Sequence, residues 1–150
     1  MEARREPLMR GGVHHIDLTV KDAHASRAFY ESVLGFMGYR YSAPIADVSG
    51  APPNGYDFDL RDGDSFCSIG ILSARGQNAS RAHDRYSPGL HHIAWTAASR
   101  EDVDAMHAHL LKMGAAILDA PADYPQYGEG YYAVFFADPD GLKLEYVYKP

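Results

Sequence analysis

Apolar and polar residues alternate in two segments of the chain, and this period of two predicts β-strands with one buried face. The segments are residues 12–20, Gly-Val-His-His-Ile-Asp-Leu-Thr-Val, and residues 89–97, Gly-Leu-His-His-Ile-Ala-Trp-Thr-Ala. Both follow the order glycine, apolar, His, His, Ile, any residue, apolar, Thr, apolar. About half of the chain separates the two copies, so the pattern predicts an internal repeat.

Each copy is followed by apolar residues at helical spacing, which predicts one amphipathic helix in each half. The first helix is predicted to begin after Asp22 and end at Gly35, and the second to begin after Ser99 and end at Gly114. Asp and Ser side chains cap helix N-termini, and glycine favours the backbone conformation that ends a helix. Three strand-like runs then follow in each half, at residues 36–41, 56–60 and 66–72, and at residues 115–118, 131–137 and 143–148.

These elements predict a fold of the α+β class with two tandem βαβββ modules. We expect a single domain over residues 12–150, with module one at 12–73, a linker at 74–88 and module two at 89–150. Residues 1–11 are expected to form a flexible N-terminus. Repeated modules pair naturally about a pseudo-twofold axis, so we predict a cup-shaped mixed sheet around a metal cleft. The modules then pair within one chain or swap across a homodimer.

One histidine of each His-His pair is predicted to face the cleft, because successive strand residues point to opposite sides of a sheet. His14 and His91 share the apolar side that packs on a helix, whereas His15 and His92 share the polar side. The same alternation places Glu145 on the cleft side of the last strand. A lone strand histidine is more often an ordinary polar group, but these positions repeat. Two imidazoles and a carboxylate suit a divalent metal such as Zn, Ni, Co, Mn or Fe(II), and three protein ligands leave room for substrate.

Tyrosines cluster in a loop that contains proline and glycine and leads into a strand of the cleft. We assign candidate catalytic roles, alongside Glu145, to Tyr131 and Tyr132. Tyr124 and Tyr127 are candidate substrate-binding residues, as an aromatic wall or as hydrogen-bond donors to a substrate oxygen. Ordinary packing in a turn is the alternative for all four tyrosines.

Two charged residues complete the candidate substrate-binding set. Arg85 shortly precedes the second His-His pair and is placed to contact an anionic substrate, with an ordinary surface loop as the alternative. Asp17 lies on the polar side of the first strand. Asp17 or Asp59 is a candidate proton acceptor, and a structural role is the alternative for each.

The amino-acid composition limits the classes of partner that the protein is expected to bind. A formal net charge of −6 argues against the clustered positive surface that nucleic-acid binding requires. The single cysteine, Cys67, excludes an intrachain disulfide and suits a reducing compartment. The N-terminal arginines precede no apolar h-region, and no apolar run reaches the length of a membrane span. We expect a cytoplasmic homodimer that binds a small-molecule substrate and neither nucleic acid nor a membrane.

Three motifs resemble the vicinal oxygen chelate superfamily, which includes glyoxalase I, bleomycin-resistance proteins and extradiol dioxygenases. They are His-Ile-Asp-Leu-Thr-Val with Ala-Phe-Tyr and Val-Leu-Gly-Phe after it, then His-His-Ile-Ala-Trp, and finally Phe-Phe-Ala-Asp-Pro-Asp-Gly-Leu-Lys-Leu-Glu. The resemblance covers nearly the whole chain from Gly12 onward. It implies paired βαβββ modules around a metal that acts as a Lewis acid on a chelating substrate.

The chain departs from two subfamilies that it resembles. In the first half, the position that matches Glu145 falls near Ile69, which offers no fourth ligand and argues against an ordinary glyoxalase I. Extradiol dioxygenases carry a tyrosine where this chain has Phe135, so Tyr131 or Tyr132 would have to substitute.

The leading hypothesis is therefore a glyoxalase-like metal-dependent enzyme of the lyase or isomerase type that acts on a small oxygenated molecule. The metal is Zn, Ni, Mn or Fe(II). An Fe(II)-dependent extradiol-type dioxygenase is the second hypothesis. A protein that binds an antibiotic or metabolite and confers resistance is the third.

Overall fold

The computed structural model describes residues 10–45 and 53–150, and these form two compact units. Unit 1 runs to Arg81 and unit 2 begins at Ala82. Each unit is described below by itself. Most of the expected flexible N-terminus, residues 1–9, lies outside the described residues.

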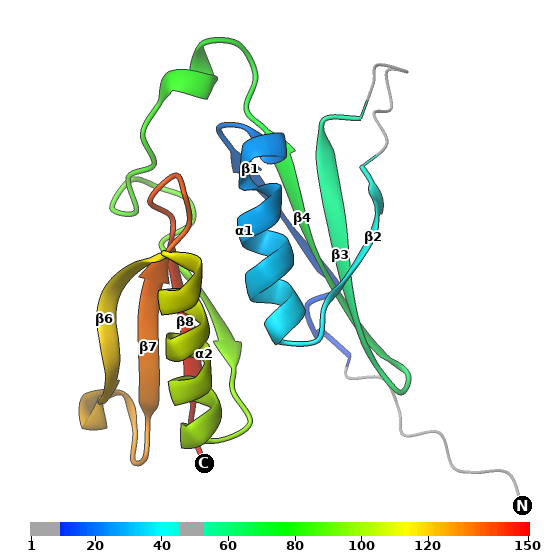
Figure 1. Ribbon diagram of the computed structural model, residues 1–150. Coiled ribbons are helices and arrows are strands. Elements are labelled where there is room, and N and C mark those ends of the chain that lie inside the picture. Colours follow the sequence, from blue (N-terminus) through cyan, green and yellow to red (C-terminus); the bar gives the residue numbers. More distant parts are fainter. Residues whose placement is uncertain (1–9, 46–52) are drawn as a thin grey trace, which may run out of the picture. The chain divides into compact units, whose positions relative to one another are not determined.

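Unit 1 contains a four-stranded sheet and one long helix (Figure 1). In chain order its elements are β1 (His15–Val20), α1 (Ala23–Phe36), β2 (Arg40–Pro44), β3 (Gly55–Asp62), β4 (Ser65–Ser73) and the 3-10 helix η1 (Gly76–Ser80). The strands lie in the order β1-β4-β3-β2. The first strand pairs in parallel with β4, and the other pairings are antiparallel.

Unit 2 repeats this arrangement with the same topology. Its elements are β5 (Ile93–Thr96), α2 (Arg100–Met113), β6 (Ala116–Asp123), the 3-10 helix η2 (Pro125–Tyr127), β7 (Tyr132–Ala137) and β8 (Lys143–Tyr148). The strands lie in the order β5-β8-β7-β6, and β5 pairs in parallel with β8. The prediction of an α+β fold with two tandem βαβββ modules is confirmed.

Both helices begin where the sequence predicted. The Asp22 carboxylate accepts hydrogen bonds from the first backbone N–H groups of α1, and the Ser99 hydroxyl caps α2 in the same way. The second helix also ends as predicted, at Gly114 with φ 69°. The end predicted at Gly35 is wrong. Helix α1 continues to Phe36, and the left-handed residue that ends it is Gly38, with φ 100°.

Strand bounds differ from the predictions mainly where turns intervene. The run predicted at 36–41 begins only at Arg40, because the end of α1 and its turn use the preceding residues. The run predicted at 115–118 extends to Asp123 as part of β6, whose pairing with β7 is interrupted by register shifts around Asp119. The first strands begin late, at His15 and Ile93.

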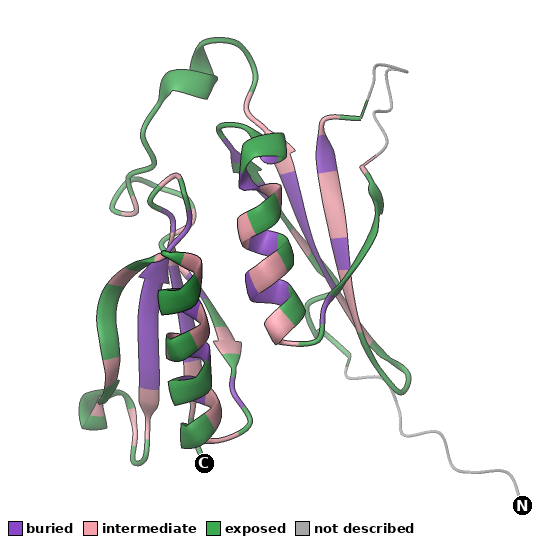
Figure 2. Ribbon diagram, in the orientation of Figure 1, coloured by how far each residue is buried: buried purple, intermediate pink, exposed green. Residues whose placement is uncertain are grey.

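Each unit builds its core between its helix and one face of its sheet, as the buried positions in Figure 2 show. Alternation along β1 buries Leu18 and Val20 and exposes His15, Asp17 and Thr19, as predicted. Other buried members of unit 1 are Tyr30, Val33, Leu34, Phe58, Ile69 and Ile71. Those of unit 2 are Ile93, Val103, Met106, Leu110, Val134, Phe136, Leu144 and Tyr146. The face of each sheet opposite its helix carries the candidate site residues that lie on regular strands, which are His15 and Asp17 on β1 and Glu145 on β8.

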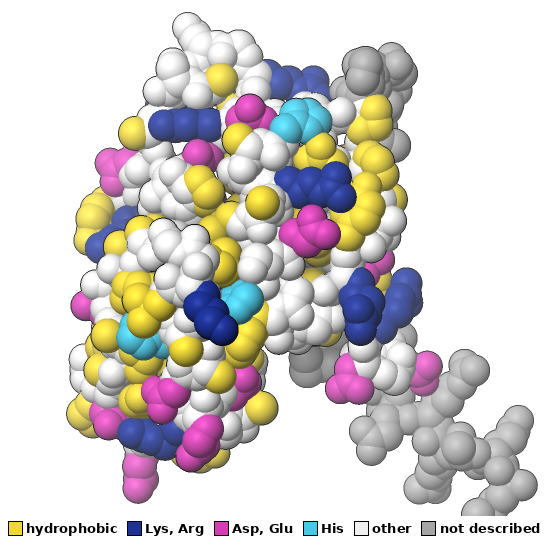
Figure 3. All heavy atoms as spheres, viewed as in Figure 1, with side chains coloured by type: hydrophobic (Ala, Val, Ile, Leu, Met, Phe, Trp, Pro, Cys, Tyr) yellow, Lys and Arg dark blue, Asp and Glu magenta, His cyan; other side chains and the backbone are white. Residues whose placement is uncertain are grey.

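None of the helices in the part of the chain that the structure describes is long and apolar enough to cross a membrane. On each unit, the face shown in Figure 3 carries basic and acidic side chains interspersed with one another.

Candidate functional site

Glu145 is the central residue of the candidate site in unit 2. It lies in the middle of β8, where its neighbours across the sheet are Ala94 on β5 and Phe135 on β7. Its side chain is only 2% exposed. Burial of a carboxylate without polar partners costs several kcal/mol, so the partners of Glu145 decide how its charge is held.

Both oxygens of Glu145 have partners. His92 directly precedes β5, and its Nε2 lies 3.2 Å from Glu145 Oε2. The hydroxyl of Tyr131, just before β7, donates a hydrogen bond to Glu145 Oε1. Burial and then this bond to Glu145 raise the pKa of Tyr131 well above its usual value, so the phenol keeps its proton near neutral pH.

The tyrosine loop packs against this carboxylate. Tyr124 stacks on Tyr127 at 5.8 Å between ring centroids, and Tyr127 meets Tyr131 edge to face at 5.4 Å. Tyr124 also meets Phe135, the neighbour of Glu145 across the sheet, at 5.4 Å. Glu145 is among the charges that raise the pKa of Tyr124, after burial and Asp119. The structure therefore brings three of the four candidate tyrosines together beside Glu145.

Tyr132 lies elsewhere. Its hydroxyl donates to Asp104 Oδ1 on α2 at 2.6 Å, and the Arg100 guanidinium lies 3.9 Å above its ring. These contacts place Tyr132 on the helix side of the sheet, because residues that alternate along β7 point to opposite faces. The structure does not bring Tyr132 to Glu145.

Arg85 lies near the second His-His pair. Its Nη2 donates to Tyr86 at 2.9 Å, whereas its buried Nε has no hydrogen-bond partner among the described residues. Desolvation and then the charges of His92, Arg85 and Lys143 lower the pKa of His91. Arg85 and Lys143 are thus positive charges in the neighbourhood of His91.

In unit 1, the face of the sheet opposite α1 carries His15 and the carboxylates of Asp17, Asp57 and Asp59. His15 pairs with Ser68, and Ser68 pairs with Asp59 on its other side. In the next row, Asp17 and Asp57 flank Gly70. A Cβ at Gly70 would collide with the carboxylate of Asp17 and lie 2.9 Å from Asp57 Oδ1. Glycine at this position lets the two carboxylates approach each other over the sheet.

This arrangement raises the pKa of Asp57. Burial is the largest cause, followed by the charges of Asp17 and Asp59, while His15 acts in the opposite direction. Asp57 was missed from sequence alone. The signal that would have found it is strand register, which places Asp57 beside Gly70 only once β3 and β4 are paired.

Asp57→Asn is expected to raise the free energy of unfolding at neutral pH. The folded-state pKa of Asp57 lies above the ordinary 3.8, so this carboxyl stabilises the fold below that pH, and the contribution is lost as pH rises through the folded-state pKa. Urea unfolding at about pH 3.5 and about pH 7 should show the larger gain at the higher pH. Asp64→Asn, in the exposed turn after β3, is the control. An equal gain at both pH values would show that charge is not the cause.

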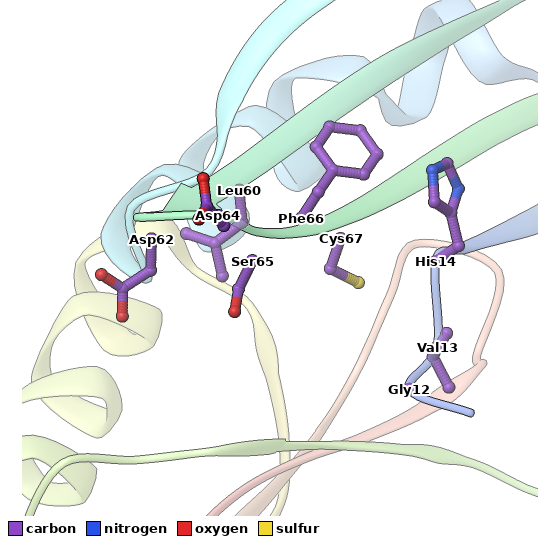
Figure 4. Close-up of a pocket in the computed structure, with 9 residues that line it drawn as sticks. All are labelled: Gly12, Val13, His14, Leu60, Asp62, Asp64, Ser65, Phe66 and Cys67. Carbon is purple, nitrogen blue, oxygen red and sulfur yellow. The ribbon is translucent and has the colours of Figure 1, made fainter. Parts of the chain in front are cut away.

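A separate pocket of about 460 Å³ opens at one end of unit 1 (Figure 4). Its lining residues are Gly12, Val13, His14, Leu60, Asp62, Asp64, Ser65, Phe66 and Cys67. None of them is a predicted ligand or substrate-binding residue. One lining residue, His14, contacts the predicted ligand His15, so the pocket adjoins that part of the predicted site.

In unit 2, His92 and Glu145 are spaced as two ligands of one divalent metal would be. Ligands at about 2.0–2.2 Å from a zinc ion lie about 3.0–3.5 Å from one another, and His92 Nε2 and Glu145 Oε2 are 3.2 Å apart. Taken unit by unit, the described residues gather no three side chains of His, Cys, Asp or Glu around one point. His15 belongs to unit 1, and His92 and Glu145 belong to unit 2.

Comparison with known proteins identifies relatives over nearly the whole chain. The profile of the Glyoxalase/Bleomycin resistance protein/Dioxygenase superfamily matches residues 12–146. The uncharacterized protein YqjT of Bacillus subtilis is 32% identical over 136 residues, which cover 90% of this chain and 97% of YqjT.

Solved structures share the fold. A glyoxalase candidate from Bacillus halodurans superposes with a TM-score of 0.73 and 27% identity, over 93% of this chain and 97% of its own. The fosfomycin resistance protein FosX from Listeria monocytogenes has a TM-score of 0.64 and 20% identity, over 95% of this chain and 96% of its own. At that identity, FosX shows similarity of fold alone.

Proposed function

Because the chain belongs to the Glyoxalase/Bleomycin resistance protein/Dioxygenase superfamily, we propose that it is a metal-dependent enzyme of the glyoxalase-like lyase or isomerase type. Its substrate is a small oxygenated molecule that binds the metal through neighbouring oxygens. The observation that carries the proposal is the buried Glu145 carboxylate held between His92 and Tyr131. A buried carboxylate with an imidazole nitrogen at ligand spacing supports a metal centre at this place.

The proposed ligands are His15, His92 and Glu145. We infer a single functional domain over residues 12–150, in which His15 comes from module one of the same chain or of a second copy in a homodimer. The metal, which is Zn, Ni, Mn or Fe(II), acts when bound as a Lewis acid toward a substrate oxygen. The single cysteine supports a reducing cytoplasm as its location.

Tyr131 orients the carboxylate. Its hydroxyl donates to Oε1, so Glu145 is fixed with Oε2 toward His92. Because the pKa of Tyr131 is raised, the phenol remains a donor over the physiological pH range. Tyr131 therefore acts on the reaction through Glu145 and, once substrate is present, through any substrate oxygen that replaces the carboxylate as acceptor.

The residues around Glu145 and His15 supply substrate contacts and a proton acceptor. Tyr124 and Tyr127 offer an aromatic wall, and the unpartnered Nε of Arg85 offers a donor to an anionic substrate. Asp17 and Asp57 lie on the face of unit 1 that carries His15. The raised pKa of Asp57 suits proton abstraction, since a base works best when its pKa approaches the working pH.

An iron-dependent dioxygenase is the second candidate. The cluster of Tyr124, Tyr127 and Tyr131 favours it, because stacked aromatic side chains suit an aromatic substrate. The same three metal ligands would form a facial triad that leaves positions open for oxygen and substrate.

Metal analysis of protein purified without added metal tests the proposal. We expect a stoichiometric divalent metal that is lost in His15→Ala and in His92→Ala and retained in His83→Ala, an exposed histidine outside the helices and strands. Zinc, nickel or manganese with turnover of an oxygenated substrate supports the lyase or isomerase. Iron with oxygen uptake on catechols supports the dioxygenase. Full metal content in both ligand variants would overturn the metal site, and ligand-induced thermal shift without turnover would favour a binding or resistance protein.

A further inference from the structure

We propose that His14 and His91 are positioning residues that fix the tautomer of the histidine that follows each of them. Each accepts, at its own Nδ1, a hydrogen bond from Nδ1–H of the neighbouring ligand histidine in the metal-loaded protein. That bond leaves Nε2 of His15 and His92 as the nitrogen with the free lone pair. The inference rests on the proposed metal site, and it gives a role to the two histidines that alternation assigned to the helix side.

The first pair lies in unit 1. Nδ1 of His14 lies 3.0 Å from Nδ1 of His15, and the two rings meet edge to face at 5.2 Å with an interplanar angle of 86°. His14 precedes the first residue of β1, so strand alternation does not govern its direction. Its ring is exposed and packs on Phe66 at 4.9 Å, so the prediction that it packs on the helix is wrong. The contact with Phe66 holds the accepting ring in place.

The second pair repeats this geometry in unit 2. Nδ1 of His91 lies 2.8 Å from Nδ1 of His92, with ring centroids 5.0 Å apart and an interplanar angle of 72°. His91 is also exposed and also has an aromatic neighbour, Tyr86, at 5.8 Å. The same nitrogen atoms therefore meet in both copies of the repeat, although the surrounding residues differ. A chance contact between two surface histidines would not be expected twice.

Hydrogen-bond chemistry gives these contacts a direction. Two nitrogens about 3 Å apart form a hydrogen bond only if one carries a proton and the other a lone pair. A histidine that binds metal through Nε2 carries its proton on Nδ1 and donates it, usually to a carboxylate, a backbone carbonyl or water. Here the acceptor in both modules is the preceding histidine. His91 and His14 then keep their own proton on Nε2.

The contact of His92 with Glu145 shows that Nε2 is the nitrogen presented to the site, since it lies 3.2 Å from Oε2 while Nδ1 is engaged by His91. In unit 1, Nδ1 of His15 is engaged by His14, so His15 reports the tautomer of the metal-free protein. The two pairs thus provide separate observations of the same arrangement.

Nitrogen-15 NMR tests the hydrogen bond directly. In the zinc-loaded protein we expect the His92 ring to be protonated at Nδ1 and bound at Nε2, with scalar coupling across the hydrogen bond between the Nδ1 nuclei of His91 and His92. The corresponding coupling is expected between His14 and His15, with or without zinc. Absence of both couplings, or protonation of His15 at Nε2 in the metal-free protein, would overturn the proposal.

Zinc titration of matched variants tests its consequence. His91→Ala is expected to weaken zinc binding by about 10–100-fold, the usual effect of removing an outer-shell partner of a metal ligand. His91→Asn, whose side-chain oxygen stands near the place of Nδ1, is expected to restore most of the affinity. His83→Ala should leave the affinity unchanged. Because His91 is exposed, the melting temperatures of the metal-free variants should match.

Two failures can be told apart. Wild-type protein that binds no zinc would refute the metal site. The coupling between His14 and His15 would then test by itself whether the two histidines are hydrogen-bonded. Wild-type protein that binds zinc while His91→Ala binds it equally well would refute the positioning role alone. Equal weakening in His91→Asn and His91→Ala would show that the ring, rather than its acceptor atom, matters, and would also overturn the proposal.

Discussion

Replacing Glu145 by glutamine is expected to reduce zinc affinity more than about 100-fold, because a direct ligand should outweigh the outer-shell partners that are each worth about 10–100-fold. The substitution keeps the shape of a side chain that is only 2% exposed. It removes the negative charge that neutralises the ion, and an amide oxygen is a much weaker ligand for zinc than a carboxylate. Turnover should fall to background together with the bound metal.

Two further variants serve as comparisons for Glu145→Gln. Tyr131→Phe keeps the carboxylate but removes the hydrogen bond to Oε1, so its affinity should fall by only about 10-fold. Glu129→Gln changes an exposed glutamate in the adjoining loop and should bind zinc normally. Calorimetric zinc titration and metal analysis after dialysis provide the measurements. If Glu145→Gln retained normal affinity, Glu145 would be a structural acid of the core.

Gly55→Ala is expected to destabilise unit 1 by about 3 kcal/mol, toward the upper end for overpacking. Gly55 begins β3 opposite Leu72 on β4. An added Cβ would collide with the backbone carbonyl oxygen of Ile71 and lie 3.1 Å from the side chain of Ile45. A backbone atom in the middle of a paired sheet cannot move away without breaking strand pairing. The steric strain therefore cannot be relieved by a small local movement.

Gly35→Ala is the matched control for the Gly55 result. Gly35 lies inside α1 with open space around it and no left-handed φ, so alanine should stabilise the helix by about 0.5–1 kcal/mol. Urea unfolding followed by circular dichroism measures both changes. A similar response to the two substitutions would show that the close approach at Gly55 is relieved by movement of the strands.

The modules and their helices could be predicted because the signals are local. Asp22, Ser99 and Gly114 act on backbone groups within a few residues of themselves, and hydrophobic spacing reports which side of an element is buried. The end of α1 was harder, because both Gly35 and Gly38 can end a helix. The buried Tyr39, whose N–H bonds back to Leu34, favours the later glycine. That contact depends on tertiary packing, which the sequence alone does not show.

The candidate site was predictable where alternation applies. Glu145 lies in the middle of a regular strand, and counting by two places it opposite the helix face. His14, His91 and His92 precede their strands, so the same rule gave the wrong surroundings for the first two. The direction of a residue before a strand depends on the loop that delivers it, and loop conformation is weakly encoded in residue type.

Tyr131 and Tyr132 illustrate the same limit of prediction from sequence. In the sequence they are adjacent tyrosines, and nothing distinguishes them as site residues. In the structure, Tyr131 donates a hydrogen bond to Glu145, and Tyr132 donates one to Asp104 on α2. Asp57 joined Asp17 only through strand register, which no single strand reveals. Contacts across a sheet depend on pairing, and pairing is specified by the whole module.

The strand order of each module has a consequence for synthesis on the ribosome. In both sheets the strand that comes last along the chain, β4 or β8, lies between the first and the third strands. While a module is being made, its first strand therefore waits without its hydrogen-bonding neighbour until the fourth has emerged. During this interval, β1 and β5 of the nascent chain have unpaired strand edges. Chaperones can bind these edges, and the edges of neighbouring nascent chains can aggregate with them.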